Sequence, residues 1–229
     1  MRKVILFIVE GKTEKLALEG ILSNIICNCN VEFQIINGDI FSDKRNKVNI
    51  RDKIKLILAT FVGNNPGIEF KNIKEVVILS DTDGCFIDNK FVIEDNNKKV
   101  IYNRSDIRCP NKSNICERNE LKSKQLKDLI EEGINIKKGI KFSIYYFSVN
   151  LDDVLYCETN LDSYEKVKLA NAFNDKYINN TSAFIKLINN KDLVLSNNYS
   201  DSWALIQNDN NSLNRKSNFN IFLKEYEMV

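Results

Sequence analysis

Two stretches of the sequence decide the fold: residues 4–11, VILFIVEG, and residues 76–84, VVILSDTDG. Each is a continuous run of apolar β-forming residues that stops at acidic residues and a glycine. A run without polar alternation is typical of a strand buried on both faces, as strands are in parallel sheets. We therefore expect two central parallel strands, each of which ends at a polar turn.

The segments around these strands follow the alternating order of an α/β protein. Apolar spacing over 13–25 predicts a first helix, for which Thr13 is a candidate cap, and the pattern over 31–36 predicts a second strand. Residues 54–61 predict a second helix, and residues 142–149 predict a fourth strand after the one at 76–79. This β-α-β-α-β order predicts a parallel sheet with right-handed crossovers, flanked by helices.

Residues 86–102 interrupt the alternation. Two β-like stretches, 90–94 and 99–102, lie on either side of a polar segment, which predicts an inserted β-hairpin. An amphipathic helix over 121–130, ending at Gly133, is expected to follow the hairpin.

The pattern changes again near residue 150. Beyond it, apolar clusters separated by Asn-rich breaks predict a mainly helical region. We expect residues 1–150 to form an α/β domain and residues 151–229 to pack on it as a helical C-terminal region. Trp203, Tyr145 and Tyr146 are expected in the core rather than as base-stacking platforms.

The composition limits the chemistry that the protein can perform. The sequence contains no histidine, which excludes Ser-His-Asp and Cys-His nucleophile systems and His-ligated metals. The 33 Lys and Arg residues nearly balance the 31 Asp and Glu residues, so a nucleic-acid binder must segregate its charge locally. No segment approaches the ~20 apolar residues of a membrane span, and the opening apolar run lacks a signal-peptide cleavage site.

These features predict a cytoplasmic protein with no membrane partner. Its six cysteines are expected as thiols, because the cytosol is reducing. A zinc site stays open as an alternative, although its four ligands would lack C-x₂-C spacing; they are Cys27, Cys29, Cys109 and Cys116.

Acidic residues follow both of the decisive strands. Glu10 follows the first strand, and Asp81 and Asp83 follow the strand at 76–79. All three should lie at the carboxyl edge of one sheet, where open α/β sheets bind ligands. Carboxylate oxygens without histidine favour Mg²⁺ or Mn²⁺. The sequence therefore predicts a metal site at these three residues.

The segments ILFIVEGKTEK (residues 5–15) and VVILSDTDG (residues 76–84) are similar to the two signature motifs of TOPRIM domains. That fold is shared by topoisomerases, bacterial primases, a ribosomal-RNA maturase, OLD-family nucleases and small phage-defence proteins of the RloB and abortive-infection type. The resemblance covers roughly residues 3 to 150 and implies a TOPRIM-like, Rossmann-like domain. By this resemblance Glu10 is the TOPRIM glutamate, and Asp81 and Asp83 are the metal-binding Asp-x-Asp pair.

The spacing of Glu10 and Glu14 resembles that of OLD-type nucleases, in which a second acid helps to hold a second metal. The pair Asp152-Asp153 matches their further acidic position, with Asp153 as the metal ligand. The chain lacks an ATPase segment like that of OLD proteins, a topoisomerase tyrosine and room for a primase polymerase region.

The resemblance implies a Mg²⁺-dependent nuclease that acts on DNA or RNA phosphodiesters, in bacterial antiphage defence, with a partner ATPase or defence-complex subunit as a possible companion. The alternative is a non-catalytic TOPRIM subunit that binds nucleic acid or acts as a sensor. Replication or RNA processing is a third setting.

Several residues have structural explanations that stay open beside the functional ones. Glu14 suits the start of a helix through the macrodipole, and Asp152 and Asp153 suit a helix start as well. Lys12 either contacts the scissile phosphate as a catalytic residue or is a solvated loop lysine. Three locally basic segments either contact the phosphate backbone or form solvated faces; they are 43–55, 137–141 and Arg215-Lys216.

Overall fold

The computed structural model describes residues 2–43, 48–96, 98–133 and 139–226. Its main sheet has five strands in the order β2-β1-β3-β7-β8. The first four are parallel: β2 (Cys29–Ile35), β1 (Lys3–Val9), β3 (Ile73–Asp81) and β7 (Lys141–Ser148). The short strand β8 (Lys216–Ser217) pairs antiparallel with β7. The predicted α/β fold with a mostly parallel sheet is therefore confirmed.

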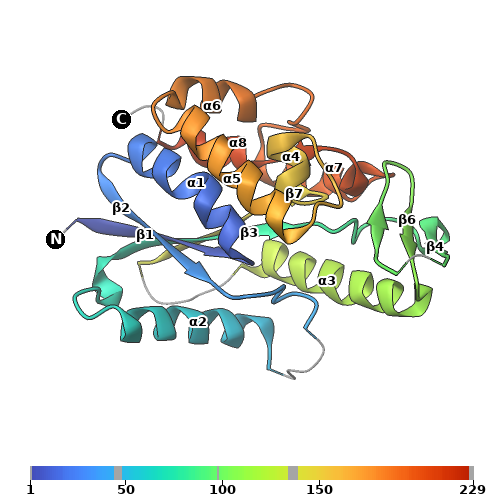
Figure 1. The fold of residues 1–229 in the computed structure, drawn as a ribbon. Helices are drawn as coiled ribbons and strands as arrows, with labels where there is room; N and C mark the ends of the chain where they lie inside the picture. The colour runs from blue at the N-terminus through green and yellow to red at the C-terminus, as the bar shows by residue number, and fades with distance from the viewer. Residues whose placement is uncertain (1, 44–47, 97, 134–138, 227–229) are drawn as a thin grey trace.

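Helices cover both faces of this sheet (Figure 1). One face is covered by α1 (Lys12–Ile25), α4 (Leu151–Tyr156), α5 (Ser163–Tyr177), α6 (Thr181–Ile188) and α8 (Phe219–Lys224). The opposite face is covered by α2 (Ile50–Asn64), α3 (Lys112–Glu132) and α7 (Tyr199–Ile206).

The central strand β1 divides its side chains between two cores. Ile5, Phe7 and Val9 pack with the helices of the first face, whereas Leu6 and Ile8 pack with those of the second. All five side chains are fully buried. Since neither face of β1 meets solvent, the strand has no position for a polar residue, which explains the continuous apolar run in the sequence.

The insertion between β3 and α3 forms a small three-stranded sheet in the order β4-β6-β5. Its strands are β4 (Val92–Glu94), β5 (Ile101–Tyr102) and β6 (Ile107–Cys109). The prediction of a hairpin between residues 90–94 and 99–102 is wrong, because β6 lies between β4 and β5 and pairs with both. The three residues of β6 were too few to show in the sequence, yet Ile107 and Cys109 are fully buried and carry the core of this sheet.

The starts of helices α3 and α1 differ from those that the sequence predicted. Helix α3 begins at Lys112, nine residues before the expected start at 121, because the Asn111 side chain accepts a hydrogen bond from the Asn114 amide at 2.9 Å. Helix α1 is preceded by Gly11 without a side-chain cap, so Thr13 does not cap it. Short 3₁₀ turns complete the chain at Phe70–Asn72 (η1), Asn89–Phe91 (η2) and Asn211–Leu213 (η3).

The C-terminal region is joined to the main sheet by a buried polar network around Asn218. Its side chain accepts a hydrogen bond from the Tyr146 amide at 2.9 Å and donates one to Ser202 Oγ at 3.0 Å. The Ser217 hydroxyl donates to the Tyr146 carbonyl at 2.8 Å. This network holds β8 beside β7, so residues beyond 150 supply a strand of the sheet as well as helices. Trp203 and Tyr146 pack edge to face within the core, as expected.

None of the helices in the described ranges combines the length and apolar character that crossing a membrane would need.

Replacing Asn218 with Ala should lower the free energy of unfolding by about 2 kcal/mol, because the buried Tyr146 amide and Ser202 hydroxyl both lose a partner. Urea denaturation followed by tryptophan fluorescence measures this change, since Trp203 lies in the adjoining core. The matched control is Asn208→Ala at an exposed position, where a change within about 0.5 kcal/mol is expected. Equal stability of the two variants would contradict the role given to Asn218.

Candidate functional site

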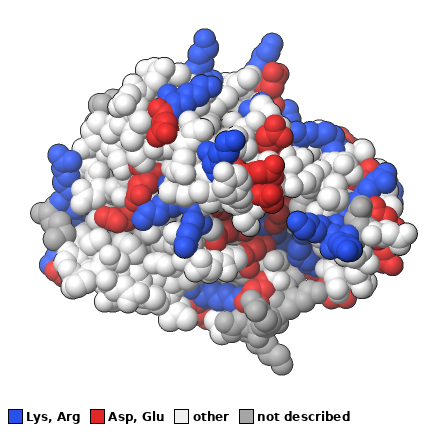
Figure 2. All heavy atoms as spheres, viewed as in Figure 1, with Lys and Arg blue, Asp and Glu red and all other residues white. Residues whose placement is uncertain are grey.

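The carboxyl edge of the main sheet brings together acids from three strand ends. Glu10 follows β1, Asp39 lies in the turn after β2, and Asp81 ends β3, with Asp83 two residues later. Figure 2 shows acidic side chains gathered in a recess near the centre of one face, with Lys and Arg side chains beside it. The structure thus brings together the three residues that the sequence predicted, and adds Asp39.

A buried ammonium lies among these acids. Lys122 of α3 has a side chain with 0% exposure, and its Nζ lies 2.6 Å from Asp83 Oδ2, 3.0 Å from Asp39 Oδ2 and 3.7 Å from Glu10 Oε1. Burial disfavours the charged form, but these carboxylates outweigh it and hold the pKa of Lys122 well above its ordinary value. The lysine is therefore a permanent cation inside the protein.

The carboxylates differ in how far this cation balances them. Burial raises the pKa of Glu10 to about 8 despite Lys122, and burial together with Glu10 and Asp83 raises the pKa of Asp81 well above its usual range. Burial acts in the same direction on Asp83, but Lys122 and Arg118 outweigh it and lower the pKa of Asp83. Lys122 thus offsets burial at Asp83 but not at Glu10 or Asp81, whose carboxyls keep their protons to a higher pH than free carboxyls do.

Asp83 is positioned by the small sheet and by α3. Arg118 donates a hydrogen bond to the Asp83 carbonyl at 2.9 Å and another to the Tyr102 hydroxyl at 2.7 Å, and its guanidinium lies 5.8 Å from the centre of the Tyr102 ring. The Asp83 amide donates to the Val149 carbonyl at 2.8 Å. These bonds hold Asp83 at a φ of 49°, in the left-handed region that aspartate tolerates better than most residues.

Asp81 and Glu14 lie on the α1 and α4 side of the site. Asp81 Oδ1 accepts a hydrogen bond at 3.0 Å from the amide of Leu151, the first residue of α4. Glu14 is 9% exposed and accepts a hydrogen bond from the Thr13 hydroxyl at 3.1 Å. Its charge contributes to the raised pKa of both Asp81 and Glu10, so the structure places Glu14 in the acidic cluster.

Asp152 and Asp153 are engaged in ion pairs of their own. Asp153 is fully buried, and both of its carboxylate oxygens accept hydrogen bonds from the Arg104 guanidinium, Oδ1 at 2.6 Å. Asp152 Oδ2 lies 2.8 Å from the ammonium of Lys166. The predicted role of Asp153 as a metal ligand would require its pair with Arg104 to open.

The basic residues singled out in the sequence have different surroundings. Lys12 is exposed in the first turn of α1, beside Glu10. Arg215 donates to the carbonyls of Asp153 and Val154, and Lys216 donates to the carbonyl of Asp192. Contrary to the phosphate-contact prediction, Arg215 and Lys216 thus fasten β8 to its neighbours. Residues 44–47 and 137–138 of the other two segments lie outside the described residues.

The donor atoms of the acidic site fit a divalent ion in part. As placed in the described ranges, the side chains include no group of three or more Cys, Asp or Glu that surrounds a metal position. Instead, Lys122 stands among three of the carboxylates. The donors are nevertheless the hard oxygens that Mg²⁺ prefers, and Glu10 Oε1 is buried without a hydrogen-bond partner. A divalent ion would displace the protons that Glu10 and Asp81 retain, so these two acids fit one added cation.

The cysteines considered for zinc lie on separate elements. Cys27 and Cys29 are at the start of β2, whereas Cys109 and Cys116 are on β6 and α3. All six cysteines are free thiols.

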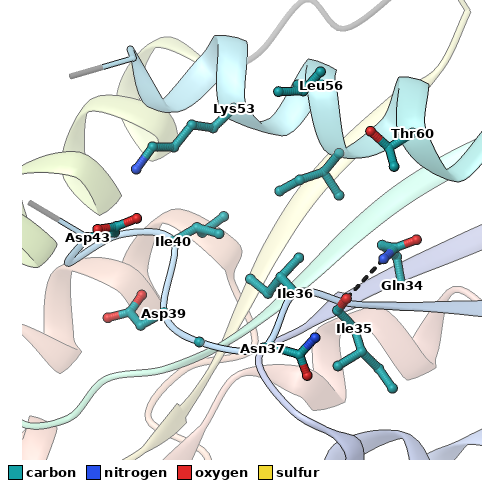
Figure 3. Close-up of a pocket in the computed structure, with 12 residues that line it drawn as sticks. Gln34, Ile35, Ile36, Asn37, Asp39, Ile40, Asp43, Lys53, Leu56 and Thr60 are labelled. Carbon is teal, nitrogen blue, oxygen red and sulfur yellow. Dashed lines mark hydrogen bonds between the residues drawn. The ribbon is translucent and has the colours of Figure 1, made fainter. Parts of the chain in front are cut away.

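A pocket of about 430 Å³ adjoins the site between the end of β2 and α2 (Figure 3). Ile36, Ile40 and Leu56 form apolar parts of its wall, and Asp39 and Lys53 add charge. Asp39 is shared, because the same carboxylate contacts Lys122. The pocket therefore opens beside the acidic cluster.

The sequence analysis did not predict four residues of the site, which are Asp39, Tyr102, Arg118 and Lys122. Lys122 carried a usable signal, because it falls in line with the buried Ile115, Leu126 and Leu129 of α3 at helical spacing. A lysine among the buried apolar positions of a helix indicates that carboxylates lie near its ammonium group. Asp39 gave no comparable signal, since an acid after Asn-Gly is common in turns.

Comparison of the chain with models of protein families, with curated protein sequences and with solved structures found no match. The resemblance to TOPRIM domains therefore rests on the two sequence motifs at residues 5–15 and 76–84 alone.

Replacing Glu10 with Gln should stabilise the metal-free protein at pH 8 and much less at pH 5. The pKa of Glu10 is raised from 4.5 to about 8 by folding, so the folded state holds a proton that the unfolded state releases. Its carboxyl therefore costs stability progressively as the pH rises from about 4.5 to 8, and the amide removes this cost. Urea denaturation at both pH values in EDTA measures the effect.

The control for this experiment is Glu120→Gln, an exposed acid of α3. It should leave the pH dependence of the wild-type protein unchanged. If the stability of Glu10→Gln showed the same pH dependence as that of wild type, Glu10 would not be an acid whose pKa is raised by folding.

Proposed function

We propose that the protein is a Mg²⁺-dependent nuclease that hydrolyses phosphodiester bonds of DNA or RNA, and that it acts in bacterial antiphage defence. The observation that carries this proposal is the convergence of Glu10, Asp81 and Asp83 at one sheet edge, where burial and neighbouring acids raise the pKa of Glu10 and Asp81. Acids in such a place are costly for folding and become useful when a divalent cation bridges them to a phosphate. The order of the two motifs, which resembles that of TOPRIM domains, supports the same reading.

Glu10, Asp81 and Asp83 would hold the ion, with Glu14 as a further acid. When bound, the ion would activate water and stabilise charge on the phosphoryl oxygens. The remaining residues supply position. Lys122 and Arg118 orient Asp83, and the amide of Leu151 orients Asp81. Lys12 is exposed one residue after the turn and is placed to meet a phosphate oxygen.

A specific observation also favours the second candidate, a non-catalytic nucleic-acid-binding or sensor subunit. Lys122 already satisfies Asp83 and Asp39 with an internal positive charge, so this half of the site needs no metal. A partner ATPase or another defence-complex subunit would then supply the chemistry. Metal-dependent cleavage by the purified chain separates the two candidates.

Purified protein should nick plasmid DNA or cleave tRNA when Mg²⁺ or Mn²⁺ is added, and EDTA should abolish the activity. Asp81→Asn and Asp83→Asn should each reduce the rate by more than about 100-fold, since even residues that only support a metal ligand are worth about 10- to 100-fold. Asp175→Asn, at an exposed position of α5, is the matched control and should retain the wild-type rate.

Binding of either nucleic acid without cleavage under any of these conditions would favour the non-catalytic subunit. Full activity of the Asp81→Asn and Asp83→Asn proteins would place the active site elsewhere on the chain.

A further inference from the structure

Lys122 stands where a helix would ordinarily present an apolar residue. It continues the buried stripe of α3, between Ile115 and Leu126, and its side chain is completely buried. A lysine in such a place is costly unless its ammonium is paired. Here the partners are three carboxylates from three separate turns of the sheet edge, at distances of 2.6 to 3.7 Å.

The cation divides the acidic site into two halves. Around Lys122, the negative charge of Asp83 is compensated. Its Oδ2 accepts a hydrogen bond from the Lys122 ammonium, and its Oδ1 lies 3.4 Å from the Tyr102 hydroxyl. On the other side Asp81 has no ion pair among the described residues, and its Oδ1 accepts a hydrogen bond from the Leu151 amide at 3.0 Å. Glu10 lies between the two halves, because its Oε1 makes no hydrogen bond and is the farthest of the three carboxylate oxygens from Lys122 Nζ, at 3.7 Å.

Charge alone shows why the ammonium and a metal exclude each other in the first half. A divalent ion bound to Asp83 Oδ2 or Asp39 Oδ2 would sit within contact distance of a fully buried ammonium. Two buried cations at that separation repel each other, and solvent cannot screen them. In the second half Asp81 lacks such a cation among the described residues, and Glu10 is farther from Lys122 than Asp39 or Asp83 is.

We propose that Lys122 is a tethered cation that fills a position which a divalent ion would otherwise occupy, so that the site takes a single ion, on the side of Glu10 and Asp81. This narrows the ligand set of the proposed function, because Asp83 pairs with Lys122 and leaves Glu10 and Asp81 to hold the ion. The two-metal arrangement suggested by Glu10 and Glu14 thereby becomes one metal and one lysine. The lysine also holds the strand-end turns together when no ion is bound. This inference rests on the metal site of the proposed function, and its test separates the two.

The decisive variant is Lys122→Met, which keeps the unbranched side chain up to the Cε position and removes the charged Nζ. Calorimetric titration with Mn²⁺ should give one bound ion in the wild-type protein and two in Lys122→Met. Without metal the variant should melt at a lower temperature, since three carboxylates lose their cation. Mn²⁺ at about 100 times the dissociation constant should then raise its melting temperature by roughly 5 to 10 °C more than that of wild type.

The matched control is Lys124→Met, at an exposed position two residues further along α3. It should bind one ion and melt as wild type does. If Lys122→Met does not fold in EDTA, the double variant Lys122→Met with Asp39→Asn removes one of the repelling charges and keeps the measurement possible. This variant should also bind one ion more than Asp39→Asn alone.

The outcomes separate the inference from the function. Two ions in wild type, or one ion with unchanged affinity in both proteins, would overturn the tethered cation; the second result would leave the metal site of the proposed function intact. No ion in wild type but binding to Lys122→Met would support the tethered cation and refute a metal-dependent nuclease. Absence of binding in both folded proteins would overturn both.

Discussion

The ion pairs of Lys122 are the interaction on which the rest of the site depends. A single ammonium joins the turns after β1, β2 and β3 to α3, and it does so in the interior, where an unpaired charge is intolerable. The consequence is mutual. The acids can be gathered at one edge because the lysine is present, and the lysine can be buried because the acids surround it.

This arrangement explains why α3 and the small sheet lie where they do. Arg118, one turn before Lys122, binds the Asp83 backbone and the Tyr102 hydroxyl of β5. The inserted sheet is thereby part of the framework of the site, although it contributes no acid to it. On the other side the first turn of α4 binds Asp81, and its neighbours Asp152 and Asp153 are neutralised by Lys166 and Arg104. Among the described residues of the site, Asp81 has no ion pair, and Glu10 has only its contact with Lys122 at 3.7 Å.

Under the proposed function, a nearly neutral protein that binds a polyanion needs its charges arranged in this way. The net charge is only +2, and several basic residues are already committed to carbonyls or to buried carboxylates. Attraction of a phosphate must therefore come from a bound cation and from local groups such as Lys12, rather than from an overall positive field. The pocket beside Asp39 adds an apolar wall next to the acids, so the neighbourhood of the site is not uniformly polar.

The sequence by itself determined the central strands and three of the acids, because both follow from local rules. A strand buried on two faces is apolar along its buried length, and its carboxyl end lies at the edge of the sheet where ligands bind. The apolar runs that end at Glu10 and Asp81 therefore predicted both the central strands and the position of the candidate site. Glu14 was singled out by the resemblance of its spacing from Glu10 to that in OLD-type nucleases. The α/β class could be predicted for the same reason, since the order of the elements repeats along the chain.

Only the tertiary structure decided which partners these acids have. Lys122 and Asp39 are 83 residues apart in the sequence, and their contact at 3.0 Å exists only because α3 packs across the edge of the sheet. The pairing of β6 between β4 and β5, the strand contributed by residues 216–217, and the bonds of Arg215 and Asp153 are likewise long-range. Local patterns carry information about burial and periodicity, whereas the sign and position of a compensating charge depend on how distant elements pack.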